Sequence, residues 1–231
     1  MIKKTALVLA ALVAGVSAQA QDAAGSSLSV TVDATYVSDY VFRGVQLADA
    51  SLQPSIEAAY GDFYAGVWHS DSLKGGVGTE TDLYAGYGIK LSDTFALDLG
   101  ATRYVYESAD AADSTEAFVG LKADVLLSPT LYYYHDFDYE ISSYIASVGY
   151  SLPVEAIKSS LDFSASYGYI QRAGDDYSYG SVGVAVPYKL AENATLTVGA
   201  DYIYNDTNTV AAFQNGKSAL LVGKIGLAIG F

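Results

Sequence analysis

The sequence predicts an all-β protein: a transmembrane antiparallel up-and-down β-barrel of about twelve strands, with ten strands as the alternative. Hydrophobic residues make up 51% of the 231 residues. Yet no stretch beyond the first twenty residues approaches the roughly 18 consecutive apolar residues of a membrane-spanning helix. Charged residues are only 16%, below the ~25% of soluble domains. Apolar residues that are abundant but interleaved with polar ones indicate strands with one apolar and one polar face.

The charge and the residue types exclude several classes of function. The formal net charge is −14, which argues against a nucleic-acid partner, because such proteins need lysine and arginine to neutralise phosphates. The chain has no cysteine, so it has neither disulfides nor cysteine-based metal sites. Its two histidines, His69 and His135, are far apart and share no ligand motif. No metal and no cofactor is therefore expected.

Residues 1–20 have the order of a secretory signal peptide. Lys3 and Lys4 form a short basic start, an apolar run extends from Ala6 to Val16, and the stretch ends in Ala-Gln-Ala. The apolar run is too short to span a membrane comfortably. We expect cleavage before Gln21, which leaves residues 21–231 as one exported β-barrel domain.

Strict alternation marks the strands in order along the chain. From Leu28 to Tyr36 the apolar residues fall at even positions and the polar ones at odd positions, a period of two. The same pattern recurs to the C-terminal residue, Phe231. Two places are hard to phase: the aromatic stretch 130–144 and the long turn 152–160. The predicted strands are 28–37, 53–61, 63–70, 79–90, 94–106, 115–126, 130–137, 140–151, 160–172, 177–189, 194–205 and 218–231.

Two kinds of connection take turns between these strands. Short ones include 61–62, 91–94, 127–130 and 190–193. Longer ones, rich in Asp, Gly and Ser, are 38–51, 71–78, 107–114, 173–176 and 206–217. This asymmetry is typical of outer-membrane barrels, which have short periplasmic turns and longer outer loops.

A secreted β-sandwich or a lipocalin-like barrel is the soluble alternative. Aromatic residues at both strand ends argue against it, because such residues anchor a barrel at the two membrane interfaces. Near the long loops these are Tyr36, Tyr106, Tyr169 and Tyr204; near the short turns they are Tyr60, Phe63, Phe95, Tyr150 and Tyr188.

The N-terminal part of the predicted barrel resembles a known family. The motif Ser-Asp-Tyr-Val-Phe-Arg-Gly at residues 38–44, followed by Phe-Tyr-Ala-Gly-Val-Trp at 63–68, resembles the TorF family of porins. The chain keeps Gln46 but lacks the serine that usually precedes it. The resemblance implies an outer-membrane barrel with a channel role. It also implies that the terminal Phe231 is presented to the barrel assembly machinery.

The polar phase of the strands places charged residues in the lumen, where they can face water. An acidic lining would favour cations over anions. Alternatively, these carboxylates pair with basic residues and only fill the barrel. The predicted pore-lining residues are Asp33, Glu57, Asp82, Asp98, Glu116, Lys122, Asp124, Asp162, Asp201 and Lys224.

Arg43 lies at the centre of the family motif, in the first long loop. It either constricts the entrance or clamps the loop by an ion pair with Asp39 or Asp49. Arg103 falls on the apolar phase of its strand, which indicates a bulge or a side chain that reaches toward the headgroups.

These features predict an outer-membrane channel for passive diffusion of small hydrophilic solutes or ions, weakly cation-preferring. A closed barrel that acts through its outer loops, as an adhesin or structural protein, is the alternative. A hydrolase is a third reading, but no catalytic residue is predicted: His69 and Ser70 are adjacent on a strand and point to opposite faces. The expected partners are outer-membrane lipid and small solutes.

Overall fold

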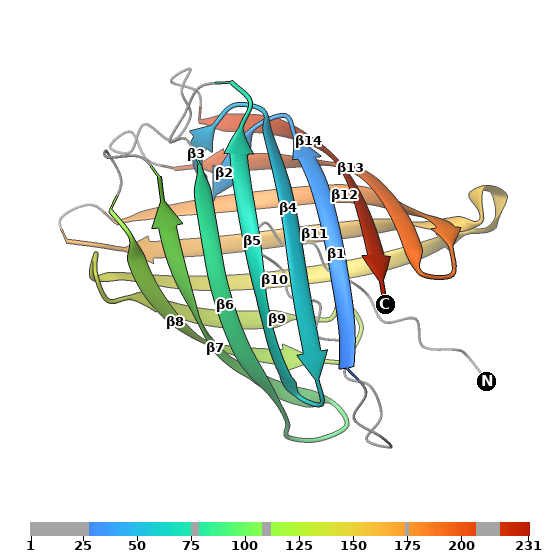
Figure 1. The fold of residues 1–231 in the computed structure, drawn as a ribbon, viewed down its shortest axis with the longest axis horizontal. Helices are drawn as coiled ribbons and strands as arrows, with labels where there is room; N and C mark the ends of the chain where they lie inside the picture. The colour runs from blue at the N-terminus through green and yellow to red at the C-terminus, as the bar shows by residue number, and fades with distance from the viewer. Residues whose placement is uncertain (1–27, 75–78, 108–111, 174–175, 207–217) are drawn as a thin grey trace.

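The computed structural model describes residues 28–74, 79–107, 112–173, 176–206 and 218–231. Among these residues, twelve strands form one closed antiparallel barrel, in the order β1-β14-β13-β12-β11-β10-β9-β8-β7-β6-β5-β4 (Figure 1). The predicted signal peptide lies outside the described residues. The barrel strands are β1 (Leu28–Val37), β4 (Ser51–Tyr60), β5 (Phe63–Ser72), β6 (Glu80–Lys90), β7 (Phe95–Tyr106), β8 (Ser114–Ala123), β9 (Thr130–Asp136), β10 (Ile141–Val154), β11 (Ser159–Gln171), β12 (Tyr177–Ala191), β13 (Ala194–Asn205) and β14 (Ala219–Gly230).

The barrel closes at β1, which pairs with β14 on one side and with β4 on the other. Ala34 lies opposite Leu227 of β14 and opposite Pro54 of β4. At the same seam the Phe231 N–H donates to the Val30 carbonyl, with 2.8 Å between N and O. Every barrel strand therefore has two neighbours, and no open edge exposes backbone groups that would need water.

Both places that are hard to phase in the sequence resolve in favour of twelve strands. The aromatic stretch forms β9, which pairs with both β8 and β10. The long turn before β11 contains one 3₁₀ turn, η1 (Glu155–Ile157), followed by Lys158 in the left-handed conformation with φ 51°. The prediction of twelve strands is confirmed, and the alternative of ten is wrong.

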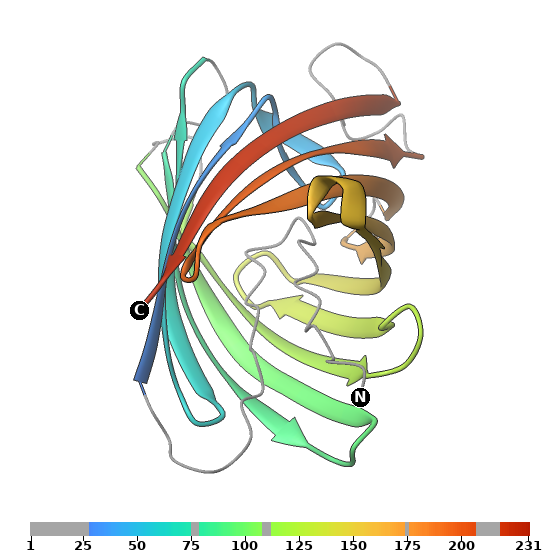
Figure 2. The same cartoon turned by 90° about the vertical axis from the view of Figure 1, so that its right-hand side faces the viewer.

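The two ends of the barrel differ as predicted. One end, here called the turn end, carries the connections 61–62, 91–94, 124–129, 155–158 and 192–193. The other, the loop end, carries 38–50, 73–79, 107–113, 137–140, 172–176 and 206–218. Residues 75–78, 108–111, 174–175 and 207–217 of the predicted long loops lie outside the described part of the chain. Because barrel strands are tilted, those of one wall cross those of the opposite wall in projection (Figures 1 and 2).

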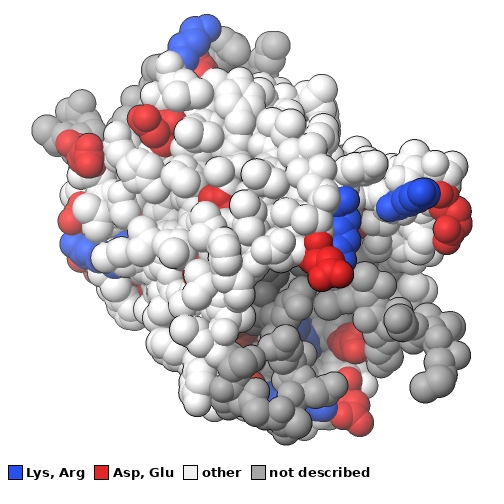
Figure 3. All heavy atoms as spheres, turned by 45° about the vertical axis from the view of Figure 1, so that its right-hand side comes forward, with Lys and Arg blue, Asp and Glu red and all other residues white. Residues whose placement is uncertain are grey.

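The outer face of the barrel is apolar and uncovered. The outward side chains of Val182, Val198 and Leu221 are 56%, 50% and 67% exposed. On the face in Figure 3 the charged side chains gather toward the borders, and most of the surface between them is uncharged. Within the described ranges, no helix is long and apolar enough to cross a membrane. Apolar exposure of this extent is typical of a surface that contacts lipid or a partner.

Exposed aromatic residues ring both ends of the outer face, with one exception to the prediction. Tyr106 faces inward, and its hydroxyl donates to Glu80 with 3.2 Å between the oxygens. It shares the even phase of Asp98 on β7, and this phase faces the lumen. The exposed aromatic residues include Tyr36, Tyr144, Tyr169 and Tyr204 toward the loop end and Tyr60, Phe63, Phe95, Tyr150 and Tyr188 toward the turn end.

Candidate functional site

The first long connection folds into a hairpin rather than an outer loop. Its strands, β2 (Tyr40–Phe42) and β3 (Val45–Ala48), pair only with each other. Val41 and Ala48 of the hairpin are each 1% exposed and pack against Ile203 and Val222 on the inner faces of β13 and β14. The apolar residues of 38–50 therefore bury themselves inside the barrel, where the wall is apolar at this level.

The hairpin reaches across the lumen through Arg43. It starts from β1 and β4, and its tip contacts Glu116 on β8 and Ser143 on β10, strands of the opposite wall. Two guanidinium nitrogens donate to the two Glu116 oxygens at 2.6 and 2.7 Å, and one also donates to the Ser143 hydroxyl at 3.0 Å. Two parallel charge-assisted hydrogen bonds fix both distance and orientation. The hairpin is thereby fastened at both sides of the barrel.

The surroundings of Arg43 favour its charged form. Its guanidinium carbon lies 4.7 Å from the ring centre of Phe42 and 4.3 Å from that of Tyr134. Both distances are within the range of cation–π attraction. Burial lowers the pKa of Arg43, but the Glu116 carboxylate together with Tyr104 and Tyr134 raises it by more, so the pKa lies above its ordinary value. The arginine and Glu116 are a buried ion pair, with side chains only 5% and 3% exposed.

Gly44 makes the tight turn at the hairpin tip. It has φ +79°, and a Cβ built on it would lie 2.4 Å from the Cβ of Tyr179 on β12. The Gly44 carbonyl accepts a hydrogen bond from the Asn205 side-chain amide at 2.9 Å. On the hairpin's other flank, Tyr40 donates to Glu80 of β6, also at 2.9 Å. The hairpin therefore contacts several strands around the wall.

The proposed pairing of Arg43 with Asp39 or Asp49 is wrong. Asp39 instead accepts hydrogen bonds from Ser38 and from the Gln46 amide, each at 2.8 Å, within the same loop. Arg43 points away from both aspartates because the loop folds inward and carries its tip to the far wall. In the structure the Arg43 guanidinium pairs with Glu116 instead.

Two adjacent acidic side chains lie under the hairpin. Glu80 and Asp82 are 3% and 4% exposed on the inner face of β6. Glu80 accepts from Tyr40 and Tyr106. Asp82 Oδ1 has no hydrogen-bond partner within the described residues. An unpaired carboxylate oxygen beside a second carboxylate is costly to bury. In the part of the chain that the structure describes, Asp82 Oδ1 and Arg43 Nε are the two buried side-chain atoms without a hydrogen-bond partner.

Most predicted pore-lining residues lie on the inner face. Lys122 pairs with Asp98 at 2.9 Å and Lys224 with Asp201 at 2.6 Å. Asp124 departs from the prediction: it follows the end of β8 in an exposed turn, where alternation no longer governs direction. Uncharged hydroxyls hold three more carboxylates: Thr35 donates to Asp33, Tyr84 to Glu57, and Ser151 and Ser160 to Asp162.

The inward polar residues that the sequence-based selection missed include three buried ones at strand ends: Glu80, Asp136 and Asn205. Each lies at the first or last position of a strand, where the pattern begins or ends and its phase is hard to assign. The alternation of inward and outward side chains, continued to both ends of each strand, would have predicted that all three face inward. No local signal points to the long-range contacts of the hairpin.

The remaining candidates lie on the outer face. His69 bonds Thr81 at 2.9 Å, whereas Ser70 is buried on the inner side of β5. The two cannot share a proton, as strand geometry predicts. His135 bonds Ser142 at 3.0 Å. Arg103 faces outward, with Asp113 and Asp138 at 3.2 and 3.6 Å, so ion pairs near the loop end accommodate it without a bulge in the pairing of β7.

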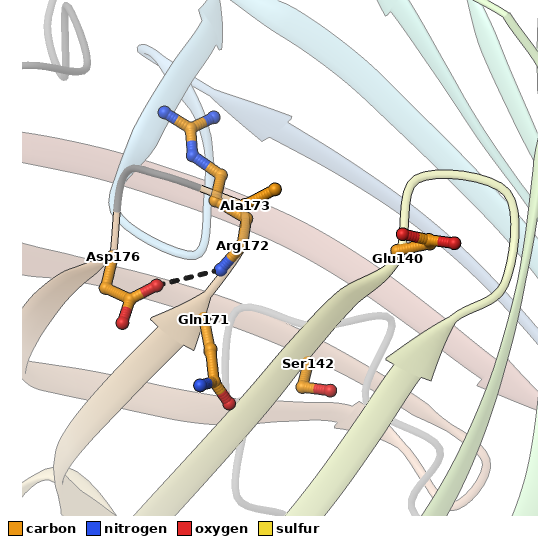
Figure 4. Close-up of a pocket in the computed structure, with 6 residues that line it drawn as sticks. All are labelled: Glu140, Ser142, Gln171, Arg172, Ala173 and Asp176. Atoms are coloured by element: carbon orange, nitrogen blue, oxygen red, sulfur yellow. Dashed lines mark hydrogen bonds between the residues drawn. The ribbon is translucent and has the colours of Figure 1, made fainter.

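A pocket of about 370 Å³ lies at the rim of the loop end (Figure 4). Its walls come from the β9–β10 turn and from the end of β11, and the Arg172 N–H donates to Asp176 at 3.0 Å. The pocket is separate from the lumen-facing residues above. It is lined by Glu140, Ser142, Gln171, Arg172, Ala173 and Asp176.

A comparison with known protein families identifies the family of this chain. Residues 20–225 match a family described as "Bacterial protein of unknown function (Gcw_chp)". The chain belongs to the Gcw_chp family. No curated protein sequence matches it significantly. The match does not name the TorF porins, so that finer resemblance stays a prediction.

This Gcw_chp protein has the fold of solved outer-membrane porins. A structure titled "KdgM porin" has a TM-score of 0.62 at 13% identity, covering 87% of this chain and 99% of that one. A "KdgM porin in complex with disordered oligogalacturonate" has 0.59 at 13%, covering 88% and 99%. A NanC porin structure has 0.59 at 12%, covering 87% and 98%. At these identities the similarity establishes the architecture alone, and in that respect the porin-like prediction is confirmed.

Proposed function

We propose that this Gcw_chp protein is a channel of the bacterial outer membrane through which small hydrophilic solutes or ions diffuse passively. The observation that carries the proposal is the division of the closed barrel into an exposed apolar outer face and a polar inner face. Lipid can contact the outer face, and water and solutes can contact the inner one. The Ser38–Gly44 motif supports assignment to the TorF porins within this architecture, and the exposed Phe231 supports recognition by the assembly machinery.

A weak preference for cations follows from the inner face. Acidic side chains outnumber basic ones there, and a narrow passage with low-dielectric walls concentrates the resulting potential. The polyanion oligogalacturonate named in one KdgM structure is the kind of solute that such a lining disfavours. Among the described residues, the inward acids are Asp33, Glu57, Glu80, Asp82, Asp98, Glu116, Asp136, Asp162 and Asp201, and the inward bases are Arg43, Lys122 and Lys224, with the exposed Lys90 and Lys189 on the inward phase at the turn end.

The hairpin is the proposed constriction. It contacts β5, β6, β8, β10, β12, β13 and β14 near the loop end. Below it the inner face is lined by side chains of the barrel strands. A side-chain-filled twelve-stranded barrel is narrow, so solutes that pass the hairpin must be small or extended.

The test is the conductance of the refolded protein in a planar bilayer, with the reversal potential measured under a KCl gradient. We expect discrete openings and a reversal potential directed toward that of K⁺. The double variant Asp33→Asn/Glu57→Gln removes two inward charges that form no salt bridge within the described residues, and the reversal potential should then move toward zero. Asp62→Asn, in an exposed turn, is the matched control and should leave it unchanged.

A closed barrel that acts through its loop end is the second candidate. The extent of hairpin contact with the wall favours it. A protein that inserts, remains folded and carries no current would refute the channel and support this alternative. Equal shifts for the lumen variant and the Asp62→Asn control would refute the assignment of selectivity to the lumen residues.

A further inference from the structure

One wall of the lumen carries aromatic rings that each cover a glycine. Each ring belongs to a residue directly opposite that glycine on the neighbouring strand, and a Cβ built on the glycine would lie 2.2–2.5 Å from a ring atom. The rings therefore lie against the wall of the barrel. The pairs are Tyr84 with Gly66, Tyr64 with Gly86, Phe118 with Gly100 and Tyr132 with Gly120.

These rings join into one column along β5 to β9. Tyr134, under Arg43, stacks on Tyr132 with 5.6 Å between ring centres and 18° between planes. Phe118 lies 6.1 Å from Tyr132. Asp98 continues the column, because it accepts from Tyr132 at 2.7 Å and from Tyr64 at 2.9 Å. The Tyr64 ring in turn lies 6.5 Å from that of Tyr84, whose hydroxyl donates to Glu57. The column thus extends from the hairpin toward the turn end.

The column offers apolar ring faces and polar groups together. Tyr84, Phe118 and Tyr132 are only partly buried, so part of each ring is uncovered on the inner face. The carboxylates of Glu57 and Asp98 and the ammonium group of Lys122 lie beside the rings. Elsewhere on the inner face, β10 to β12 carry several serine hydroxyls. These are Ser143, Ser147, Ser151, Ser160, Ser164, Ser166 and Ser181.

We infer that this column is a binding track for neutral oligosaccharides, a substrate class that rests on the proposed channel function. The C–H face of a pyranose ring is apolar and packs on an aromatic face, while its hydroxyls need donors and acceptors at the edge. Flat rings flanked by carboxylates and an ammonium group supply both. A chain of sugars can move from one ring to the next without losing all contacts at once.

The charged side chains beside the rings favour neutral over acidic sugars. Beside the rings, Lys122 and Arg43 already pair with Asp98 and Glu116. Glu57 accepts a hydrogen bond from the Tyr84 hydroxyl and forms no ion pair within the described residues. The positive charges beside the rings are thus offset by carboxylates, and an acidic sugar would meet carboxylates that repel it.

The experiment adds oligosaccharides to single channels and measures the fraction of time for which the current is blocked. Maltohexaose is the neutral probe, hexagalacturonate the anionic one and a chitosan hexamer the cationic one. Phe118→Leu removes a ring that makes no side-chain hydrogen bond, and Tyr132→Leu removes a second ring. Tyr133→Leu, on the outer face of the same strand, is the matched control. Calorimetry on the detergent-solubilised protein measures binding without requiring current.

We expect maltohexaose to block the channel and each inward variant to weaken binding by about 3- to 10-fold, the worth of one aromatic contact. Tyr133→Leu should leave binding unchanged. A channel that conducts but is not blocked and binds no probe overturns the track and leaves the channel proposal intact. Block by chitosan or hexagalacturonate alone overturns the neutral class. A silent barrel that still binds maltohexaose, with the same loss in Phe118→Leu, refutes the channel and supports the sugar-binding surface.

Discussion

Removal of the Arg43 side chain tests whether one ion pair holds the hairpin across the lumen. In Arg43→Ala, Glu116 stays buried at 2% exposure with the Tyr104 hydroxyl, at 3.1 Å, still donating to it but with no cation. Breaking a buried ion pair by removing one partner costs about 3–5 kcal/mol. The barrel strands keep their own pairing, so this cost falls on the docking of the hairpin. At about 1.4 kcal/mol per tenfold, the ratio of undocked to docked hairpin rises by roughly two to three and a half orders of magnitude.

A cysteine placed at a buried position of the hairpin measures the ratio of undocked to docked hairpin. The chain has no cysteine of its own, and Ala48 is 1% exposed on the hairpin. Ala48→Cys should react slowly with a water-soluble maleimide, and at least about 100-fold faster when Arg43→Ala is added. Conductance should increase in parallel. Ser29→Cys, exposed on β1, should react at the same rate in both backgrounds.

A double variant separates the ion pair from the loss of side-chain volume. Arg43→Met/Glu116→Leu removes both charges, so it should cost less than the sum of the single changes, because no uncompensated charge stays buried. Equal labelling of Ala48→Cys with and without Arg43 would refute the reasoning. It would mean that the apolar packing of Val41 and Ala48 is enough to hold the hairpin.

Three further expectations test other parts of the structure. Asp82→Asn should keep or raise the temperature of unfolding, monitored by heat-dependent gel mobility, because it removes one of two adjacent buried carboxylates; a marked drop would contradict this. Gly44→Ala should loosen the hairpin, because φ +79° is strained for alanine and the added Cβ would meet Tyr179. The labelling of Ala48→Cys should then become faster, and an unchanged rate would show that the turn is not strained. Val182→Arg, on the outer face, should cost about 2–4 kcal/mol of folding free energy in lipid if it lies at the bilayer midplane, whereas Ser181→Arg on the inner face should cost less. Equal costs for the two arginines would contradict a lipid-facing outer surface.

The strands were predictable because their pattern is local. Side chains alternate along every strand, so the pattern of residues from Leu28 to Tyr36 is enough to predict which face of that strand is apolar. The same alternation placed Asp98 and Asp201 on the inner face. The alternation did not hold for Asp124, because a residue past the end of a strand has no fixed direction. For Tyr106 the aromatic ring suggested a membrane interface, whereas its even position on β7 predicts a side chain that faces inward, as the structure shows.

The sequence by itself thus determined the architecture: twelve strands, their approximate limits, and the apolar and polar faces of the barrel. Only the tertiary structure decided where residues 38–50 lie and what Arg43 contacts. Glu116 is 73 residues away in the chain, and the two meet only because closure of the sheet brings β8 opposite β1 and β4. A pattern of period two describes neighbours along a strand, whereas a contact across the lumen depends on the curvature and closure of the whole barrel.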